Sequence, residues 1–353
     1  MPILNKKVSL CRYQIEGDMS ALVATLAEGL KANAFADSFT AAYHAGPVNI
    51  DDLLDISWAV SGPEKGEYLT FALRIDTRSI PAPALKLEIA KREKAELAAS
   101  GLKKLPRSRR KELKELVFDL LLQTAPAKPK TFDVVIDSLA GVLYSEAMPP
   151  VVQSSFEELC AQLNVKAVLE TPSIRAARVL SSEEPKEQPS KPKEVDDSVS
   201  QDFLTWLWWH VSENGPVIGG GKVDFTGSMT ATNEEGKVVS SDKSEEPVFT
   251  ELKAAVASGK HITKATLLIA KDDLEWTVTL DSWLNINGLQ CPSEVSNDDE
   301  TPDAAFLERI FLIEEFDLLL DSIYKIFLDV RLSSRWAEAT NSIEKWANVT
   351  VSE

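Results

Sequence analysis

The chain has 353 residues, and its 38 Lys and Arg residues against 55 Asp and Glu residues give a formal net charge of −17. With 44% hydrophobic and 26% charged residues, its composition is that of a folded globular protein and excludes an intrinsically disordered chain. The overall acidity argues against a nucleic acid as partner only if the charge is evenly spread along the chain.

Three further features exclude other classes of protein. The N-terminal residues lack an apolar core with a small-residue cleavage site, so we expect no secretory signal. The longest apolar-rich stretch, residues 306–328, is interrupted by seven charged side chains, so we expect no transmembrane span and no membrane partner. The odd and widely spaced Cys11, Cys160 and Cys291 do not form a disulfide framework, which predicts a cytoplasmic location.

Positive charge is concentrated in one segment. Residues 86–115 hold 11 basic and 5 acidic residues, a net charge of +6. Residues 201–353 hold 12 basic and 27 acidic residues, a net charge of −15. Because screening limits electrostatic interactions to roughly 8–10 Å, the local charge matters more than the total. The chain can therefore offer a positive surface to an anion despite its acidity.

A change of composition divides the chain. Residues 181–200 contain three prolines, no aromatic residue and few aliphatic ones, which predicts a flexible linker or loop. It separates an N-terminal α+β region, residues 1–180, from a C-terminal α+β region, residues 201–353.

The N-terminal region begins with a predicted strand at residues 3–15. Asp18 or Ser20 is expected to cap a helix that ends near Leu30. The apolar stripe of this helix consists of Leu22, Val23, Leu26 and Leu30. Strands are then predicted at residues 53–60 and 67–76.

A basic helical segment follows at residues 86–122. Gly101 and Pro106 are expected to divide it into two helices. The second helix begins near Arg107 with four cations, although the helix dipole favours acids at this end. Such a local conflict hints that an anion docks there. A hairpin around residues 137–141 and a helix at 156–163 complete the region.

The C-terminal region opens with an aromatic cluster at residues 203–211. Its other predicted elements are a strand at 223–232, a helix at 248–258, a hairpin at 264–282 and C-terminal helices within 303–346. Runs of strands and helices with antiparallel signals predict an α+β fold, with antiparallel sheets and flanking helices.

Catalytic patterns are scarce. His44, His210 and His261 have no zinc-binding spacing, and we expect no metal and no cofactor. The glycine run before Lys222 lacks both the earlier glycine and the hydroxyl residue of a phosphate-binding loop, which favours a flexible approach to a strand.

Two other clusters leave alternatives open. Asp272, Asp273 and Glu275 can hold Mg²⁺ in a nuclease or serve plain turn chemistry, and the turn is favoured. Trp206, Trp208 and Trp209 can stack on bases, but the interleaved leucines favour core packing or a subunit contact.

The basic segment is the best candidate for a binding site, because lysine and arginine neutralise phosphates. The alternative is a solvated helix with intrahelical pairs such as Arg92–Glu96 and Lys111–Glu115. The candidate DNA-binding residues are Lys86, Lys91, Arg92, Lys103, Lys104, Arg107, Arg109, Arg110, Lys111 and Lys114, together with Lys260 and Lys264 ahead of the predicted hairpin.

Four stretches, in this order and spacing, resemble RdgC, the recombination-associated protein family of bacteria. They are IPAPALKLEIAKREKAELAASGLKKLPRSRRKELKELVFDLLL (80–122), TFDVVIDSLAGVLY (131–144), SGKHITKATLLI (258–269) and DAAFLERIFLIEEFDLLLDSIYKIFLDV (303–330). The resemblance covers most of residues 1–330, more loosely in the first 60.

The resemblance implies a non-catalytic protein that binds double-stranded DNA with little sequence preference, with single strands as a further candidate ligand. It implies an RdgC-like homodimer that forms a ring around DNA, restrains RecA-dependent homologous recombination and associates with the nucleoid. Two alternatives stay open: a metal-dependent exonuclease, and an acidic protein-interaction module built on the C-terminal half.

Overall fold

The computed structural model describes residues 2–36, 41–59, 61–181, 195–242, 249–292 and 302–349. Contacts between residues divide the chain into two compact units. Unit 1 consists of Met1–Glu16, Ala140–Ala147 and Ala167–Glu353, and unit 2 consists of Gly17–Leu139 and Met148–Lys166. Both units combine helices with antiparallel strands, which confirms the predicted α+β class.

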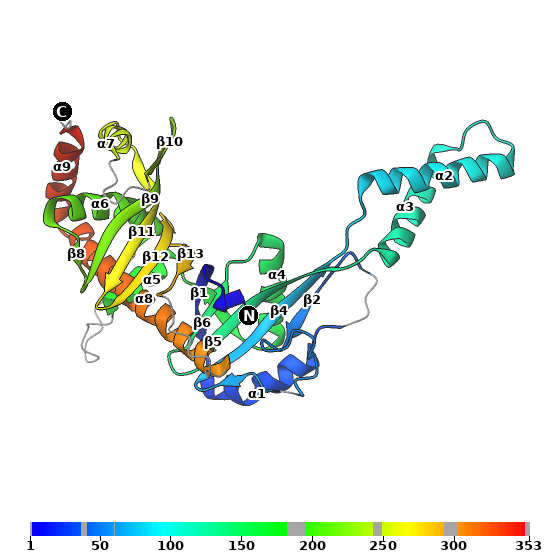
Figure 1. Cartoon of the computed structure of the whole chain (residues 1–353), viewed down its shortest axis with the longest axis horizontal. Coiled ribbons are helices and arrows are strands. Elements are labelled where there is room, and N and C mark those ends of the chain that lie inside the picture. Colours follow the sequence, from blue (N-terminus) through cyan, green and yellow to red (C-terminus); the bar gives the residue numbers. More distant parts are fainter. Residues whose placement is uncertain are drawn as a thin grey trace. The chain divides into compact units, whose positions relative to one another are not determined.

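Unit 2 is built around one long strand, β4 (Tyr68–Thr77), most of whose residues are buried. Its elements in chain order are α1 (Met19–Ala32), β2 (Tyr43–Val48), β3 (Glu64–Lys65), β4 (Tyr68–Thr77), α2 (Ala82–Ser100), α3 (Arg107–Thr124), β5 (Lys128–Asp137) and α4 (Pro150–Gln162). Strand β4 pairs antiparallel with β5, β2 and β3. Helices α2 and α3 are inserted between β4 and β5, beyond the ends of these two strands (Figure 1).

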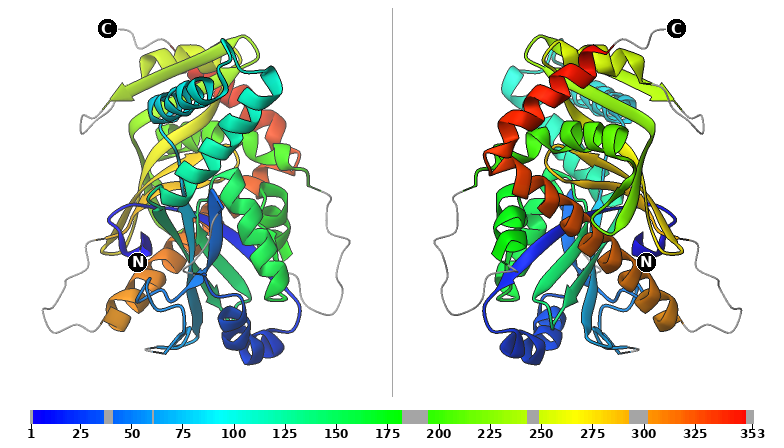
Figure 2. Two further views of the ribbon diagram at one scale, coloured as in Figure 1. Left: turned by 90° about the vertical axis from the view of Figure 1, so that its right-hand side faces the viewer. Right: turned by 90° about the vertical axis from the view of Figure 1, so that its left-hand side faces the viewer.

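Unit 1 holds most of the strands. Its elements are η1 (Pro2–Leu4), β1 (Val8–Glu16), β6 (Val142–Glu146), β7 (Lys166–Leu169, whose first residue belongs to unit 2), α5 (Pro172–Ser181), η2 (Asp197–Asp202), α6 (Phe203–Asn214), β8 (Val217–Ile218), β9 (Gly221–Asn233), β10 (Gly236–Asp242), α7 (Thr250–Ala257), β11 (His261–Lys271), β12 (Leu274–Asp281), β13 (Ile286–Gln290), α8 (Pro302–Arg331) and α9 (Arg335–Asn348). The strands lie in the order β10-β9-β11-β12-β13-β1-β6, and neighbouring strands are antiparallel. Helices α6, α8 and α9 cover one face of these strands (Figure 2).

The core of unit 1 lies between this sheet and α8. On β12, Trp276, Val278 and Leu280 are fully buried, while Thr277 and Thr279 on the opposite face are half-buried, as the alternation predicts. The face of α8 that packs into this core is also buried, and it consists of Phe306, Ile310, Ile313, Leu320, Ile323 and Phe327. Burying each such side chain contributes roughly 1.5–3 kcal/mol.

The aromatic cluster forms helix α6 and belongs to the same core. Trp206 is 1% exposed and Trp208 is 7% exposed, so neither presents a face for stacking on bases. Trp208 packs edge-on against Trp346 of α9, with ring centroids 4.8 Å apart. The expectation of core packing is confirmed for Trp206 and Trp208, whereas Trp209 is only half-buried. None of the helices in the described ranges has an apolar stretch suited to crossing a bilayer.

The glycine run is required by close packing against α8. Gly219 has a φ of +63°, and a Cβ atom placed there would lie 2.8 Å from the main-chain nitrogen of Ile323. A Cβ atom on Gly221 would lie 2.9 Å from a methyl group of Leu319. A Cβ atom on Gly220, by contrast, would meet no atom within 4 Å. The run therefore lets the chain pass close beside α8 as it enters β9.

Three arginines and three carboxylates, here called the ionic cluster, are brought together inside unit 1: Arg12, Glu170, Arg175, Arg178, Asp317 and Asp321. Arg175 of α5 is 4% exposed, and its Nη2 lies 2.7 Å from both Asp317 Oδ1 and Asp321 Oδ1 on α8. Burial alone would lower the pKa of Arg175, but these carboxylates and Glu170 raise it above its ordinary value. The guanidinium thus stays charged inside the unit.

The other members of the ionic cluster join further elements. Arg12 of β1 places its Nε 3.0 Å from Asp317 Oδ2 and also pairs with Glu170. Arg178 pairs with Glu170 at 2.8 Å and with Asp321 at 2.5 Å. Burial would raise the pKa of Asp317, but Arg175, Arg12 and Arg178 hold it below its ordinary value. The cluster therefore connects β1, α5 and α8 through charges that compensate one another.

The strand predicted at residues 53–60 is wrong. The Asp55 carboxylate accepts hydrogen bonds from the main-chain N–H groups of Ser57 and Ala59, which folds the segment into a turn. Trp58 has a left-handed φ of +56°, which no strand residue adopts. Turn chemistry therefore overrides the apolar pattern of this segment. The unpredicted β2 supplies the strand on that side of β4.

The predicted linker also needs correction. Ser181 ends α5, and the final residues of the segment form η2, in which Val199 is 4% exposed and Ser200 is 1% exposed. Residues 182–194 lie outside the described residues. The flanking residues on both sides belong to unit 1, so the two units do not divide at this segment. In α1 the N-cap is Asp18, and Val23 of the predicted stripe is exposed.

We expect Gly219→Ala to destabilise the protein more than Gly220→Ala. Both glycines have a positive φ, so each substitution strains the backbone by roughly 1–2 kcal/mol. Only Gly219→Ala adds the clash with Ile323, which costs about 1–3 kcal/mol more. Urea denaturation of the two variants measures the difference, and equal midpoints would contradict the packing against α8.

The ionic cluster predicts a loss of stability in acid. Because the pKa of Asp317 is lower in the folded protein, its contribution is present above the unfolded pKa of about 4 and is lost as the pH falls below it. Arg175→Met leaves three largely buried carboxylates with only two cations, Arg12 and Arg178, and this uncompensated charge should cost roughly 3–5 kcal/mol at pH 7. Urea denaturation between pH 7 and pH 3 tests both points. An Asp317→Asn variant with an unchanged pH profile would show that another group dominates.

Candidate nucleic-acid interface

Ten of the twelve predicted binding residues lie on α2, α3 and the loop between them, here called the basic hairpin (residues 82–124). Helix α2 ends at Gly101, whose φ of +68° is left-handed and whose N–H donates to the Leu97 carbonyl. Pro106 stands directly before α3. The predicted division of the basic segment into two helices is confirmed.

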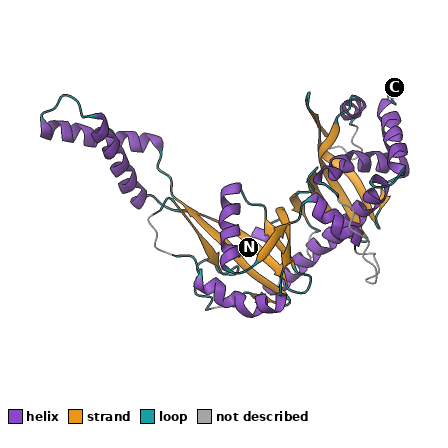
Figure 3. Ribbon diagram, turned by 180° about the vertical axis from the view of Figure 1, so that it is seen from behind, coloured by secondary structure: helices purple, strands orange, loops and turns teal. Residues whose placement is uncertain are grey.

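The basic hairpin has a small core of its own. Leu105, Leu113 and Val117 are buried, and four partly buried side chains pack against them: Leu85, Ile89, Leu97 and Leu121. Figure 3 shows the two helices side by side, joined at one end by their loop. Helix α2 has no buried residue, and its three lysines are all exposed to solvent. The apolar contacts fix the helix pair and leave its charges outside.

Ion pairs cross between the two helices. Arg109 Nε lies 2.5 Å from Glu96 Oε1, and Arg110 Nε lies 2.9 Å from Glu93 Oε1. The predicted Arg92–Glu96 pair is therefore wrong: Glu96 contacts α3 instead, and Arg92 pairs with Glu88 at 3.1 Å. Arg109 and Arg110 thus serve the helix contact as well as the surface charge.

Every acid between residues 86 and 115 has a cation partner. Glu88 pairs with Lys91 and Arg92, Glu112 pairs with Arg109, and Glu115 pairs with Lys111 at 3.8 Å, which confirms that predicted pair. Within the described residues, the cations of this segment that make no ion pair are Lys86, Lys94, Lys103, Lys104, Arg107 and Lys114, and all six are exposed. These six unpaired cations carry the excess positive charge.

A groove of about 310 Å³ runs between the helices. It is lined by Ile89, Glu93, Arg110, Lys111, Leu113 and Lys114. Two apolar side chains and three cations therefore meet there with a single acid, which Arg110 already pairs. An anion placed along this groove would meet more positive than negative charge.

The N-terminus of α3 adds to the positive potential. Its N-cap, Pro106, supplies no side-chain hydrogen bond, and no acid lies in the first turn. The N–H groups at a helix start carry a partial positive charge and attract phosphate. Lys103, Lys104 and Arg107 lie close to this end in the sequence. The helix dipole disfavours cations here, but a bound anion would neutralise both the cations and the partial positive charge of the helix end.

Three cations that were not among the predicted binding residues lie at the base of the basic hairpin: Arg78, Lys128 and Lys130. In the β4–β5 ladder, Lys128 lies opposite Thr77 and Lys130 lies opposite Ile75. Residues 78–131 hold 14 basic and 6 acidic residues, a net charge of +8. Lys128 and Lys130 stand on either side of Pro129 in the sequence, but they lie far from residue 78 along the chain.

The last two predicted residues lie in the other unit. Lys260 is half-buried and its Nζ donates to Asn233 Oδ1 at 2.7 Å, which makes it part of the β9–β11 connection. Lys264 is exposed on β11, opposite Asp281 of β12. These two lysines therefore belong to a different unit from the basic hairpin.

The acidic residues Asp272 and Asp273 form the turn of the β11–β12 hairpin. Asp272 has a left-handed φ of +52° between β11 and β12, a conformation that aspartate tolerates better than most residues. No group of three potential metal ligands occurs in the described part of the chain. The geometry of Asp272, Asp273 and Glu275 thus favours the turn over a nuclease site.

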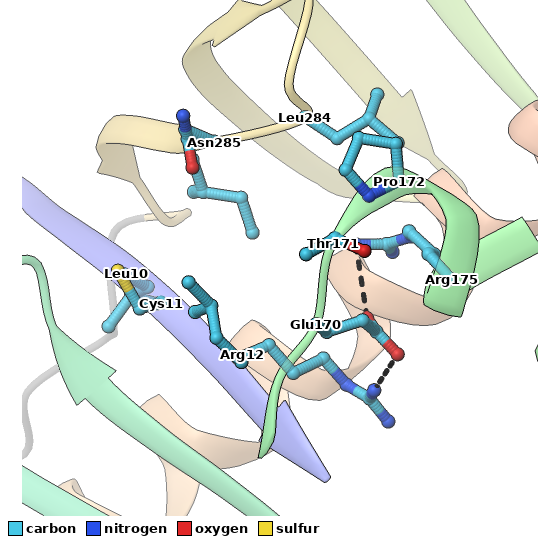
Figure 4. Close-up of a pocket in the computed structure, with 11 residues that line it drawn as sticks. Leu10, Cys11, Arg12, Glu170, Thr171, Pro172, Arg175, Leu284 and Asn285 are labelled. Atoms are coloured by element: carbon cyan, nitrogen blue, oxygen red, sulfur yellow. Dashed lines mark hydrogen bonds and ion pairs between the residues drawn. The ribbon is translucent and has the colours of Figure 1, made fainter. Parts of the chain in front are cut away.

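A cavity beside the ionic cluster is too small for an organic ligand. It measures about 20 Å³, enough for one water molecule, and lies between β1, the start of α5 and the segment before β13. Figure 4 shows Arg12 paired with Glu170 at its wall, near Thr171 and Pro172. The charged side chains at this cavity pair with one another, which favours a structural role for the cluster.

No protein-family model matches this chain, and no curated protein matches it either. What the chain does is therefore inferred from its own residues, above all from the six unpaired cations of the basic hairpin.

Proposed function

We propose that the chain binds double-stranded DNA without sequence preference, through backbone phosphates held by the basic hairpin. The observation that carries this proposal is the set of six exposed cations that have no ion-pair partner among the described residues. Cations with no internal partner are free to neutralise phosphates, and the released counterions supply affinity that does not depend on sequence. Arg107 can bind a phosphate with two hydrogen bonds, whereas the lysines act as point charges.

The dimensions of the basic hairpin suit a duplex. Helices α2 and α3 have 19 and 18 residues, so each is roughly 27–28 Å long. One turn of duplex DNA rises about 34 Å and carries a negative charge every ~1.7 Å of axis. Cations spread from Lys86 to Lys104 can therefore meet phosphates along most of one turn.

The acidity of the remaining chain favours one location for the DNA. Outside residues 78–131, the other 24 basic and 49 acidic residues leave a net charge of −25. Phosphates are repelled from such surfaces and attracted to the basic hairpin. The charge distribution thus supports binding at one place rather than a general affinity for polyanions.

The resemblance to RdgC extends the proposal. By that resemblance, two copies of the chain form a ring around duplex DNA, act without catalysis and restrain RecA-dependent recombination at the nucleoid in the bacterial cytoplasm. Support from the molecule itself is limited to the α+β fold and the basic hairpin within residues 80–122, where the resemblance is strongest.

Binding should weaken steeply with salt. With six phosphates neutralised, the logarithm of the association constant should fall against the logarithm of salt concentration with a slope of about −5. Fluorescence anisotropy with two unrelated duplexes of equal length measures the slope, and both should give the same affinity. A flat salt response, or a 100-fold preference for one duplex, would contradict backbone recognition.

Charge reversal should separate binding from folding. The triple variant Lys103→Glu, Lys104→Glu, Arg107→Glu removes only unpaired cations, so the Arg109–Glu96 and Arg110–Glu93 contacts remain. We expect DNA affinity to fall by roughly 100-fold or more and the salt slope to drop by about 3.

The matched control reverses three exposed lysines of unit 1: Lys6→Glu, Lys7→Glu and Lys345→Glu. It changes the net charge by the same amount and should bind DNA almost as well as the unmodified chain. Circular dichroism and thermal melting confirm that both variants fold. If both variants lose affinity equally, the total charge matters and the basic hairpin is not the contact surface.

A further inference from the structure

We propose that the outer edge of β10 pairs antiparallel with β10 of a second copy of this chain. The pairing would continue the sheet of unit 1 across a twofold axis. This inference deepens the homodimer proposed above by naming a contact surface, and it does not depend on DNA binding.

Strand β10 ends the order of strands in unit 1. It pairs with β9 from Gly236 to Asp242 in one unbroken register, without a bulge. In the described part of the chain no strand lies on its other side. The strand contains no proline, and Lys237 is the only charged residue between its two ends. A long regular edge of this kind is a template for another strand.

The β9–β11 contact shows which main-chain groups of β10 face outward. The Thr230 carbonyl points toward β11, where it accepts a hydrogen bond from the Thr263 hydroxyl. Val239 lies opposite Thr230 in the β9–β10 ladder, so its own N–H and C=O point away from β9. By alternation along the strand, the same groups of Lys237 and Ser241 also point outward.

The terminal strand of unit 2 is different. Strand β2 contains Pro47, and the Pro47 carbonyl accepts a hydrogen bond from the Phe35 N–H at 3.0 Å. The Ala36 N–H donates to the His44 ring at 3.2 Å, so the segment after α1 lies over this edge. The free edge of β2 is therefore blocked in the manner usual for single-chain proteins, whereas that of β10 is open.

The sequence of β10 is self-complementary in one register. When Val239 lies opposite its own copy, Lys237 lies opposite Ser241 of the second chain, and three residue pairs exchange main-chain hydrogen bonds. Val239 is 54% exposed, and the pairing would cover this apolar side chain with its twofold mate. The two copies of Lys237 would be roughly 14 Å apart along the strands, so like charges do not meet.

Cysteine cross-linking tests the register. Residues that form a hydrogen-bonded antiparallel pair have Cα atoms about 5.5 Å apart, which suits a disulfide. Val239→Cys should therefore give a covalent dimer on oxidation. Lys237→Cys and Ser241→Cys should each fail alone, and the chain carrying both should cross-link. The unmodified chain, with Cys11, Cys160 and Cys291, measures the background.

A proline variant tests the contribution of the edge to assembly. Val239→Pro removes an outward N–H group that β9 does not use. The dissociation constant of the dimer, measured by analytical ultracentrifugation of the full chain, should rise roughly 100-fold or more. The control Val239→Thr keeps the N–H group and the β-branched shape, so its dissociation constant should stay near that of the unmodified chain.

The possible results separate this inference from the proposed homodimer. Cross-linking in the stated pattern, with dissociation by Val239→Pro, supports the pairing of β10. A stable dimer that shows neither effect overturns the pairing but leaves a homodimer with another interface. A chain that stays monomeric at tens of micromolar overturns both the pairing and the proposed homodimer.

Discussion

The buried ionic cluster is the interaction on which the arrangement of unit 1 depends. Arg175 meets Asp317 and Asp321 on α8, while Arg12 of β1 pairs with Asp317 as well. Three cations and three anions balance, so each charge is compensated where desolvation would otherwise make it costly. Hydrophobic burial alone lets α8 slide or rotate on the sheet, whereas paired charges permit one position along the helix.

The basic hairpin also contains ion pairs, but its cations outnumber its acids. Its helix contact combines apolar packing with ion pairs such as Arg109–Glu96 and Arg110–Glu93. These pairs are partly exposed and contribute little individually, but together with the pairs within each helix they engage every acid between residues 86 and 115. What remains between these residues is the positive charge of six exposed side chains. The charges of the ionic cluster compensate one another, whereas the basic hairpin keeps an excess of positive charge that a ligand can neutralise.

Much of the fold could be predicted from the sequence because its signals are local. Gly101 and Pro106 mark the ends of two helices, and the alternation on β12 marks its buried face. The pairs between α2 and α3 could not be predicted, since they depend on how two helices rotate against each other. The contribution of the cations at residues 78 and 128 could not be predicted either, because only the pairing of β4 with β5 brings them together, across about fifty positions of the sequence.

The absence of buried residues in α2 has a consequence for motion. A helix pair held by a small core of its own, two short connections to β4 and β5, and surface ion pairs can open while β4 and β5 stay paired. Its amide hydrogens would then exchange with solvent faster than those of β4 or α8, at a free-energy cost well below global unfolding. The charged element is thus a separate cooperative unit, which a bound polyanion would order and protect.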